Sequence, residues 1–300
     1  MPGNMARSDP RLSVRVTRGT GSGQHLASVL QEGRENANID AGLGFIWRIS
    51  VKVNRMFSRV RAKIVSKLRV ALSRCASSRC APVYPPDLSW EYFFHQIRSH
   101  DIRIRSVFDV GVAAGTPELY SAFPDADLFL FDPTRQAAQH MQKIAAERSA
   151  VVFNVALGEK NGTIRLFVPD AHASATVFEE VDPVSSATET VAVARFDDLV
   201  PEVKGPALCK IDVQGAELMV LQGMTNAIPA IDFFILEVST IPTLVDAPDF
   251  AEVNAFMQDR GFVVYDILSL LRRPLDGALA QMDVGYVRRN SVLRRDKRWG

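Results

Sequence analysis

The sequence predicts an α/β fold with a mainly parallel sheet, because apolar strand-like runs alternate with helix-like segments between residues 106 and 290. Two of the runs end at an acidic residue, and the first of these passes into a glycine turn that opens a helix. Strands are expected near 106–110, 127–131, 151–155, 207–212, 232–238, 262–266 and 284–288. Helices are expected near 116–122, 134–147, 215–222 and 249–260. This alternation is typical of a Rossmann-like sheet covered by helices on both faces.

One stretch of the domain departs from the alternation. Residues 158–195 contain strand-like runs at 162–168 and 191–194, with no good helix between them. We therefore expect a β insertion above the main sheet.

Charge divides the chain into two parts. Residues 1–80 carry 15 Lys and Arg against 4 Asp and Glu, a net charge of +11, while residues 81–300 carry a net charge of −10. We expect a disordered tail over 1–44, where Gly, Ser, Arg and Asn dominate, and a basic amphipathic helix over 45–80. The apolar face of that helix, within 45–74, either lies on anionic lipid or packs on the domain or on a second subunit. Alternatively, synthesis starts downstream, for example at Met56.

The rest of the chain divides at its proline-rich and basic segments. Residues 81–105 are expected to form a linker and a capping helix, because prolines at 82, 85 and 86 oppose an earlier helix. A single α/β domain over 106–290 and a basic tail over 291–300 complete the chain.

Cysteine usage and hydropathy indicate a reduced, cytoplasmic protein, and residues 45–74 could give it a peripheral contact with a membrane. The three cysteines are Cys75, Cys80 and Cys209, and none has the spacing of a zinc site. The sequence has no run of the roughly 20 apolar residues that a membrane-spanning helix needs. Its start also lacks the apolar core of a secretory signal.

The acidic ends of the first two strands favour a nucleoside-containing cofactor. Asp109 opens the turn that contains Gly111 and Gly115, whose small size lets a ligand approach the backbone. Asp132 ends the next strand, where a carboxylate can pair with a ribose diol. Asn154 and its neighbours follow the third strand, where an adenine could rest. Nicotinamide enzymes more often have Gly-x-Gly-x-x-Gly at the first turn.

Two later strands also end in acids. Asp212 follows one strand and Glu237 lies near the end of another, and both should meet the earlier acids at one edge of the sheet. Such clustering costs free energy unless a cation or hydrogen bonds compensate, which favours a functional site. Lys210 is expected to pair with a neighbouring acid, and Glu217 falls in the first turn of the following helix.

These motifs, taken in order, resemble the FkbM family of class I S-adenosylmethionine-dependent methyltransferases. The resemblance covers about residues 106–288, and its most specific part is the run Lys-Ile-Asp-Val-Gln-Gly-Ala-Glu at 210–217. It implies a seven-stranded sheet with one antiparallel strand, S-adenosylmethionine as cofactor, and O-methylation of a hydroxyl on a glycan or small metabolite. The implied cofactor contacts are Asp109, Gly111, Gly115, Asp132, Asn154, Ala156 and Leu157.

The sequence departs from the family pattern at three places. Gln214 stands where the family usually has Glu, and Asp132 stands where Glu is common. The glycine loop contains Val112 and Ala114, and Pro117 follows at the first turn of the helix, where proline is tolerated.

A hydroxyl acceptor needs a base or strong polarisation at its oxygen. Asp212, Glu217 and Glu237 are the carboxylate candidates, and His172 in the insertion is a fourth. The acids could also hold a divalent metal that acidifies the hydroxyl, but no spacing specifies one, so we predict no metal site.

Two other functions remain as alternatives. The first is a degenerate methyltransferase fold that acts as a binding module docked by its basic helix. The second is an NAD-dependent oxidoreductase on a similar fold. A nucleic-acid partner is not expected, because the basic tail has no interleaved aromatics and the domain is acidic. We expect a small-molecule or glycan substrate.

Overall fold

The computed structural model describes residues 88–169, 175–179 and 186–299, which belong to one compact unit. The predicted tail over 1–44, the helix over 45–80, Cys75, Cys80 and His172 lie outside the described residues. None of the helices in the described ranges combines the length and apolarity needed to cross a bilayer.

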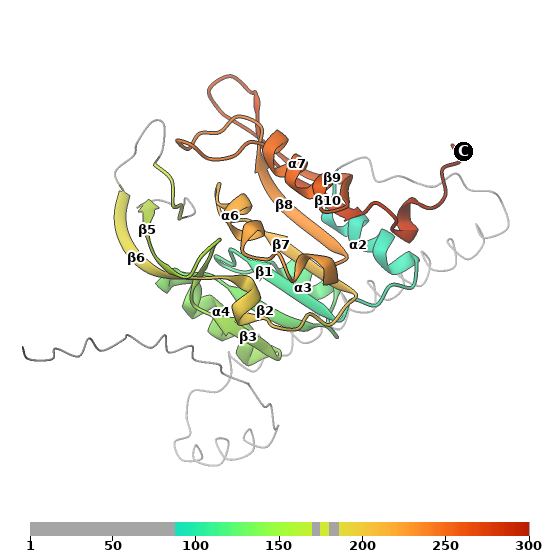
Figure 1. Cartoon of the computed structure of the whole chain (residues 1–300), viewed down its shortest axis with the longest axis horizontal. Helices are drawn as coiled ribbons and strands as arrows, with labels where there is room; N and C mark the ends of the chain where they lie inside the picture. Colours follow the sequence, from blue (N-terminus) through green and yellow to red (C-terminus); the bar gives the residue numbers. More distant parts are fainter. Residues whose placement is uncertain (1–87, 170–174, 180–185, 300) are drawn as a thin grey trace, which may run out of the picture. The chain divides into compact units, whose positions relative to one another are not determined.

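The core of the fold is a seven-stranded sheet with the order β3-β2-β1-β7-β8-β10-β9 (Figure 1). Its strands are β1 (Ser106–Val110), β2 (Asp127–Phe131), β3 (Ala150–Phe153), β7 (Ala207–Ile211), β8 (Phe233–Ser239), β9 (Phe262–Arg272) and β10 (Leu279–Arg288). Neighbouring strands from β3 to β8 pair in parallel, and β10 pairs antiparallel with both β8 and β9. The expected class I methyltransferase sheet with one antiparallel strand is confirmed.

Helices cover both faces of this sheet. They are α2 (Trp90–Ser99), α3 (Pro117–Ala122), α4 (Arg135–Glu147), α5 (Phe196–Leu199), α6 (Glu217–Gln222) and α7 (Phe250–Asp259). Side chains of α2, α3 and α4 pack in one apolar cluster, and those of α5, α6 and α7 pack in another on the opposite face. Strand β1 is buried along its whole length. Its Val107 packs in the cluster with α2, α3 and α4, and its Phe108 packs in the cluster with α5, α6 and α7. This explains why the run reads as continuously apolar.

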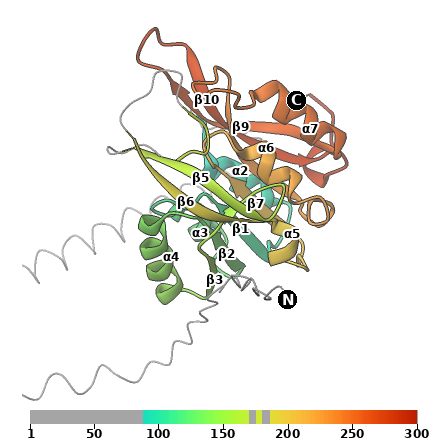
Figure 2. The same cartoon turned by 60° about the vertical axis from the view of Figure 1, so that its left-hand side comes forward.

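The β insertion is a separate three-stranded sheet with the order β4-β6-β5 (Figure 2). Its strands are β4 (Ala156–Leu157), β5 (Gly162–Pro169) and β6 (Ser186–Ala194). β5 and β6 form an antiparallel ribbon, and Phe167 is also bridged to Thr176. The structure therefore confirms the insertion and extends β6 five residues earlier than the 191–194 predicted.

Local sequence signals explain where the helices begin. Thr134 precedes α4 and its side chain accepts a hydrogen bond from the Ala137 N–H at 3.2 Å. Asp249 and Glu252 form a capping box at the start of α7. Ser89 precedes α2 without a side-chain cap, and that helix is held by burial of Phe93, Phe94 and Ile97.

The turn after β1 depends on glycine at position 111. Gly111 has a φ of +81°, and a Cβ added there would overlap the backbone oxygen of Asp212 at the end of β7. The close approach of these two strand ends therefore requires a residue without a side chain. Gly277, in the β9–β10 turn, has a φ of +74° but no atom within 4 Å of an added Cβ.

We predict that Gly111→Ala lowers the free energy of unfolding by more than about 4 kcal/mol, because backbone strain and a steric clash coincide. The matched control Gly277→Ala meets strain alone and should cost about 1–2 kcal/mol. Urea unfolding of both variants measures the difference, and equal losses would contradict the steric account of position 111.

Candidate functional site

The glycine turn is tied to the end of β2. The Gly111 N–H donates to the Phe131 carbonyl at 2.9 Å, and the Ala113 N–H donates to Asp132 Oδ2 at 3.0 Å. Ala113 and Ala114 are exposed, and Gly115 closes the turn with a φ of +106°. Small residues thus leave the backbone of this turn open to a ligand while Asp132 fixes its shape.

Asp132 is more deeply placed than the sequence indicates. The residue is 6% exposed, and Oδ1 accepts hydrogen bonds from the N–H and hydroxyl of Thr134 at 2.8 and 2.7 Å. Asn154 lies beside it, exposed, and donates from its amide to the Asp132 carbonyl at 2.7 Å. Ala156 is half-buried and Leu157 packs in the core. The structure thus brings Asp132 and Asn154 together at one edge, and their contacts with a cofactor stay a prediction.

Asp109 has no exposed surface. Oδ2 of Asp109 accepts hydrogen bonds from the Thr116 hydroxyl at 2.8 Å and from the Tyr120 phenol, and Oδ1 lies 3.1 Å from Lys210 Nζ. In this arrangement the Asp109 carboxylate stabilises the glycine turn from the protein interior and does not face a ligand. Burial, reinforced by Asp109, raises the pKa of Tyr120, which keeps this phenol protonated.

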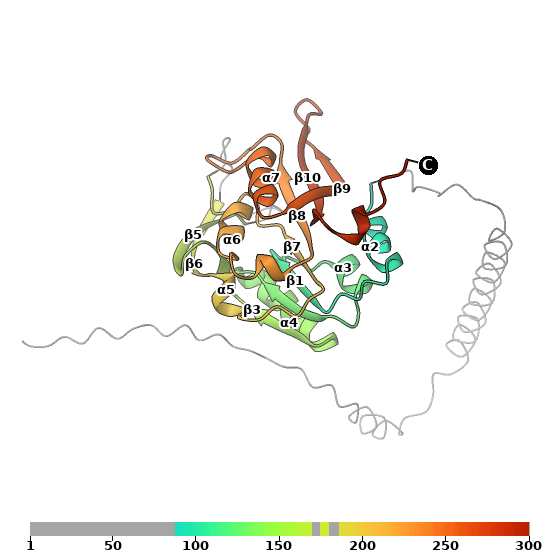
Figure 3. The same cartoon turned by 45° about the vertical axis from the view of Figure 1, so that its right-hand side comes forward.

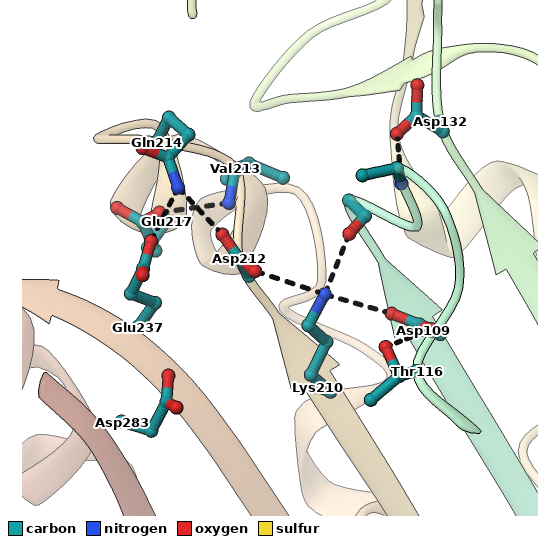
Figure 4. Close-up of polar contacts among 12 residues, drawn as sticks. Asp109, Thr116, Asp132, Lys210, Asp212, Val213, Gln214, Glu217, Glu237 and Asp283 are labelled. Atoms are coloured by element: carbon teal, nitrogen blue, oxygen red, sulfur yellow. Dashed lines mark hydrogen bonds and ion pairs between the residues drawn. The ribbon is translucent and has the colours of Figure 1, made fainter. Parts of the chain in front are cut away.

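Lys210 joins the two central strands (Figure 4). Its side chain is 6% exposed, and its Nζ lies 3.1 Å from Asp109, 3.3 Å from Asp212 and 2.7 Å from the Gly111 carbonyl oxygen. Burial alone would lower the pKa of Lys210, but the two carboxylates outweigh it and raise that pKa, so the ammonium stays charged. The expected pairing of Lys210 with a neighbouring acid is thus present, and it is made with two.

A second cluster follows on the same edge. Gln214 Nε2 donates to Asp212 Oδ1 at 3.0 Å and to Glu237 Oε2 at 2.6 Å, which bridges the ends of β7 and β8 (Figure 4). Gln214 has a φ of +52°, a left-handed conformation that costs roughly 1 kcal/mol for a residue other than glycine. Its carbonyl accepts a hydrogen bond from the Thr176 hydroxyl at 2.8 Å. The residue that departs from the family pattern is therefore the one that links the two carboxyls.

The two carboxyls of this cluster differ in charge. Burial raises the pKa of Glu237 to about 9, and the neighbouring Asp212 adds to that rise. Burial also opposes ionisation of Asp212, but Lys210 and hydrogen bonds from Glu237 and Gln214 prevail, so the pKa of Asp212 is lowered. At neutral pH Asp212 is thus ionised while Glu237 keeps its proton. The Asp212 side chain is 33% exposed and accessible to a ligand.

Glu217 is placed to hold the turn rather than to meet a substrate. It is 3% exposed, and Oε1 accepts hydrogen bonds from the N–H groups of Val213 at 3.1 Å and Gly215 at 3.2 Å. Burial raises the pKa of Glu217 to about 7. Of the three carboxylate candidates, the structure therefore brings Asp212 and Glu237 together and sets Glu217 beneath them.

Asp283 lies beside the candidate site and is not among the residues predicted from the sequence. It pairs with Glu237 in the β8–β10 register and accepts hydrogen bonds from Trp90 Nε1 at 3.0 Å and the Ser269 hydroxyl at 2.5 Å. Burial raises the pKa of Asp283. Its position just before the predicted 284–288 strand was the available signal, but only the register shows that it faces Glu237. No group of three or more His, Cys, Asp or Glu that could hold a metal occurs among the residues described here.

Two connecting segments cover the 212–217 turn. The Val245 N–H donates to the Glu179 carbonyl at 2.8 Å, which ties the segment after β8 to residues 175–179. An added Cβ at Gly215 would contact side chains of Leu244, Ala247 and Phe178 at 3.0 to 3.3 Å. The turn that carries Asp212 and Gln214 is therefore walled by apolar side chains on one side.

Comparison with known proteins identifies this arrangement. The family model described as "Methyltransferase FkbM domain" matches residues 109–264, just over half of the chain. The chain belongs to the FkbM methyltransferase family. S-adenosylmethionine is the cofactor of this class I fold, and this membership favours methyl transfer over the NAD-dependent alternative.

Individual relatives are more distant. The chain is 26% identical over 167 residues to the hexuronic acid methyltransferase AglP of Haloferax volcanii, a match that covers 53% of this chain and 69% of that protein. The magnesium protoporphyrin IX methyltransferase of Synechocystis, solved with S-adenosylmethionine bound, is 12% identical with a TM-score of 0.38 and coverages of 66% and 77%. An rRNA methylase from Streptococcus thermophilus is 12% identical with a TM-score of 0.38 and coverages of 69% and 99%.

We predict that Lys210→Met lowers the free energy of unfolding by about 3–5 kcal/mol, because it leaves two carboxylates without their buried cation. Adding Asp109→Asn to this variant removes one of the stranded charges and should restore part of the loss. A double-mutant cycle by urea unfolding measures the coupling. Additive losses from the two substitutions would contradict the ion triad.

We predict that infrared spectroscopy detects a protonated carboxyl at pH 7 that ionises with a midpoint of about 9 and is absent in Glu237→Gln.

The raised pKa of Glu237 also fixes how the free energy of unfolding depends on pH. An unfolded chain releases this proton near pH 4.5, so Glu237 disfavours folding increasingly as the pH rises from about 4.5 to about 9. Glu237→Gln should flatten that slope. A Glu237 carboxyl already ionised at pH 7 would contradict the assignment.

Proposed function

We propose that this protein is an S-adenosylmethionine-dependent O-methyltransferase that methylates a sugar hydroxyl. The observation that carries the proposal is Asp212, an ionised and partly exposed carboxylate fixed beside the open glycine turn. The distant similarity to a hexuronic acid methyltransferase supports a glycan as the acceptor.

The glycine turn suits the cofactor's methionine part. Ala113 and Ala114 are exposed and lack side chains that would cover the backbone between Gly111 and Gly115. Asp132 and Asn154, on the neighbouring strand ends, are the residues we assign to the ribose and adenine. When bound, S-adenosylmethionine supplies a methyl group on a positively charged sulfur, which is already a good leaving group.

Asp212 has the properties required to accept the proton that the hydroxyl loses. A carboxylate offers about four acceptor positions, and Lys210, Gln214 and Glu237 donate to three of those on Asp212. The remaining position can accept a hydrogen bond from the acceptor hydroxyl, orient its oxygen and take its proton as the carbon–oxygen bond forms.

Glu237 and Gln214 support that step without taking the proton themselves. Glu237 is protonated at neutral pH, so it donates a hydrogen bond to Asp212 instead of competing for the same proton. Gln214 adds no charge, and its amide keeps the two carboxyls in fixed orientation. Because Glu237 is neutral, methylation can use Asp212 without the repulsion that an ionised carboxylate at Glu237 would impose.

We predict that Asp212→Asn lowers kcat by about 10²–10⁴-fold while S-adenosylhomocysteine still binds. Calorimetry measures cofactor-product binding, and methyl transfer from labelled S-adenosylmethionine to neutral and uronic-acid-containing oligosaccharides measures activity. The matched control is Asp125→Asn, which removes an exposed carboxylate near the opposite edge of the sheet and should leave both measurements unchanged.

Two outcomes would contradict the proposal in different ways. No heat of binding with S-adenosylhomocysteine would favour the degenerate binding module instead of an enzyme. Full activity of Asp212→Asn, with intact binding, would remove Asp212 from proton transfer and leave the methyltransferase assignment standing.

A further inference from the structure

The hairpin of β9 and β10 ends in an exposed apolar tip. Leu270 is 42% exposed, Leu271 is 55% exposed and Leu275 is 83% exposed, and all three lie within residues 270–277, which we call the hairpin tip. Leu270 lies beside Met282 and Leu271 beside Gln281 in the ladder with β10, so the tip is apolar on both faces. Three exposed leucines gathered within eight residues make this tip a candidate contact surface.

The hairpin tip lies at the same edge of the sheet as the candidate site. Strand β10 runs antiparallel to β8, and Gln281 pairs with Ser239 at the carboxyl end of β8, two residues beyond Glu237. The tip continues past that end, and Figure 3 shows the β9–β10 turn projecting beyond the neighbouring ribbon. A fourth exposed apolar side chain on this side is Val245, which is 45% exposed. Its segment begins where the Thr240 N–H donates to the Ala280 carbonyl.

Charge at the hairpin tip is positive. Arg273 forms an ion pair with Asp276 at 2.6 Å, which leaves the exposed Arg272 as the unneutralised charge of the tip. Arg272 also donates to the Gly277 carbonyl at 3.1 Å, so its guanidinium is held at the turn. Leucines beside an arginine match a lipid surface, because its interior is apolar and its headgroups are anionic.

The size of the tip distinguishes a lipid surface from a second protein. A stable protein interface takes about 20–30 residues from each partner, whereas the hairpin tip presents the three exposed leucines Leu270, Leu271 and Leu275. A lipid surface requires only that a few apolar side chains enter the acyl boundary while cations remain at the headgroups.

We propose that the hairpin tip inserts into an anionic lipid surface and holds the carboxyl edge of the sheet, with Asp212 and Glu237, against it. The docking itself stands independently of the chemistry. Its consequence rests on the proposed function: the sugar acceptor is carried at the membrane surface, where it reaches Asp212 without leaving the lipid.

Tryptophan substitutions in the full chain test the docking. In Leu275→Trp, vesicles of phosphatidylglycerol and phosphatidylcholine with brominated acyl chains should quench most of the fluorescence that the new indole adds. The control Val264→Trp lies on the same strand, roughly 25 Å from the tip at about 3.3 Å per residue, and is partly exposed like the tip. The brominated vesicles should not quench the fluorescence that the new indole adds in Val264→Trp. Vesicles of phosphatidylcholine alone should quench Leu275→Trp less.

Three outcomes would overturn the proposal. Equal quenching of the two variants would show that the tip does not insert. A buried, blue-shifted emission of Leu275→Trp before lipid is added would show that another segment of this chain covers the tip. Dimerisation that Leu275→Glu abolishes would assign the tip to a second copy. Since S-adenosylhomocysteine binding is measured without lipid, a failure of docking is distinguishable from a failure of the proposed function.

Discussion

The buried ammonium of Lys210 is the interaction on which the site depends. Asp109 and Lys210 are register partners on β1 and β7, so the parallel pairing itself puts a cation beside a buried carboxylate. The same nitrogen reaches Gly111 and Asp212, at the ends of those two strands. One charge thus fixes the glycine turn and the candidate base relative to each other, and it offsets the cost of burying Asp109.

The proton chemistry of the edge follows from that charge. Lys210 stabilises the anion at Asp212. Burial, together with that anion, keeps the proton on the next carboxyl along the sheet, Glu237, and a neutral amide joins the two. Gln214 adopts a left-handed backbone conformation to make this link, and contact with Thr176 holds it there. A strained backbone of this kind persists where the surrounding contacts hold it in place, as the contacts of Gln214 do at this turn.

Much of this could be predicted from the sequence, and the failures have physical causes. The 3.6-residue and buried-strand patterns located the elements of the sheet, and the acidic strand ends located the edge that carries the candidate site. The long hairpin was missed: β9 runs to Arg272 and β10 begins at Leu279, because the tip is exposed on both faces and lacks a burial pattern. The side-chain direction of Asp109 and the partner of Asp283 depend on register between strands, which a single sequence does not specify.

The charge state of Lys210 tests the central claim most directly. Carbon-13 NMR of the lysine ε-carbons, with Lys210→Met to assign the resonance, reports whether that ammonium loses its proton. The ion triad predicts no titration of Lys210 at or below 10.5, the ordinary lysine value, because two carboxylates hold the charge. A titration midpoint below 10.5 would mean that burial outweighs the carboxylates, and it would contradict the account of an ionised Asp212 held beside the glycine turn.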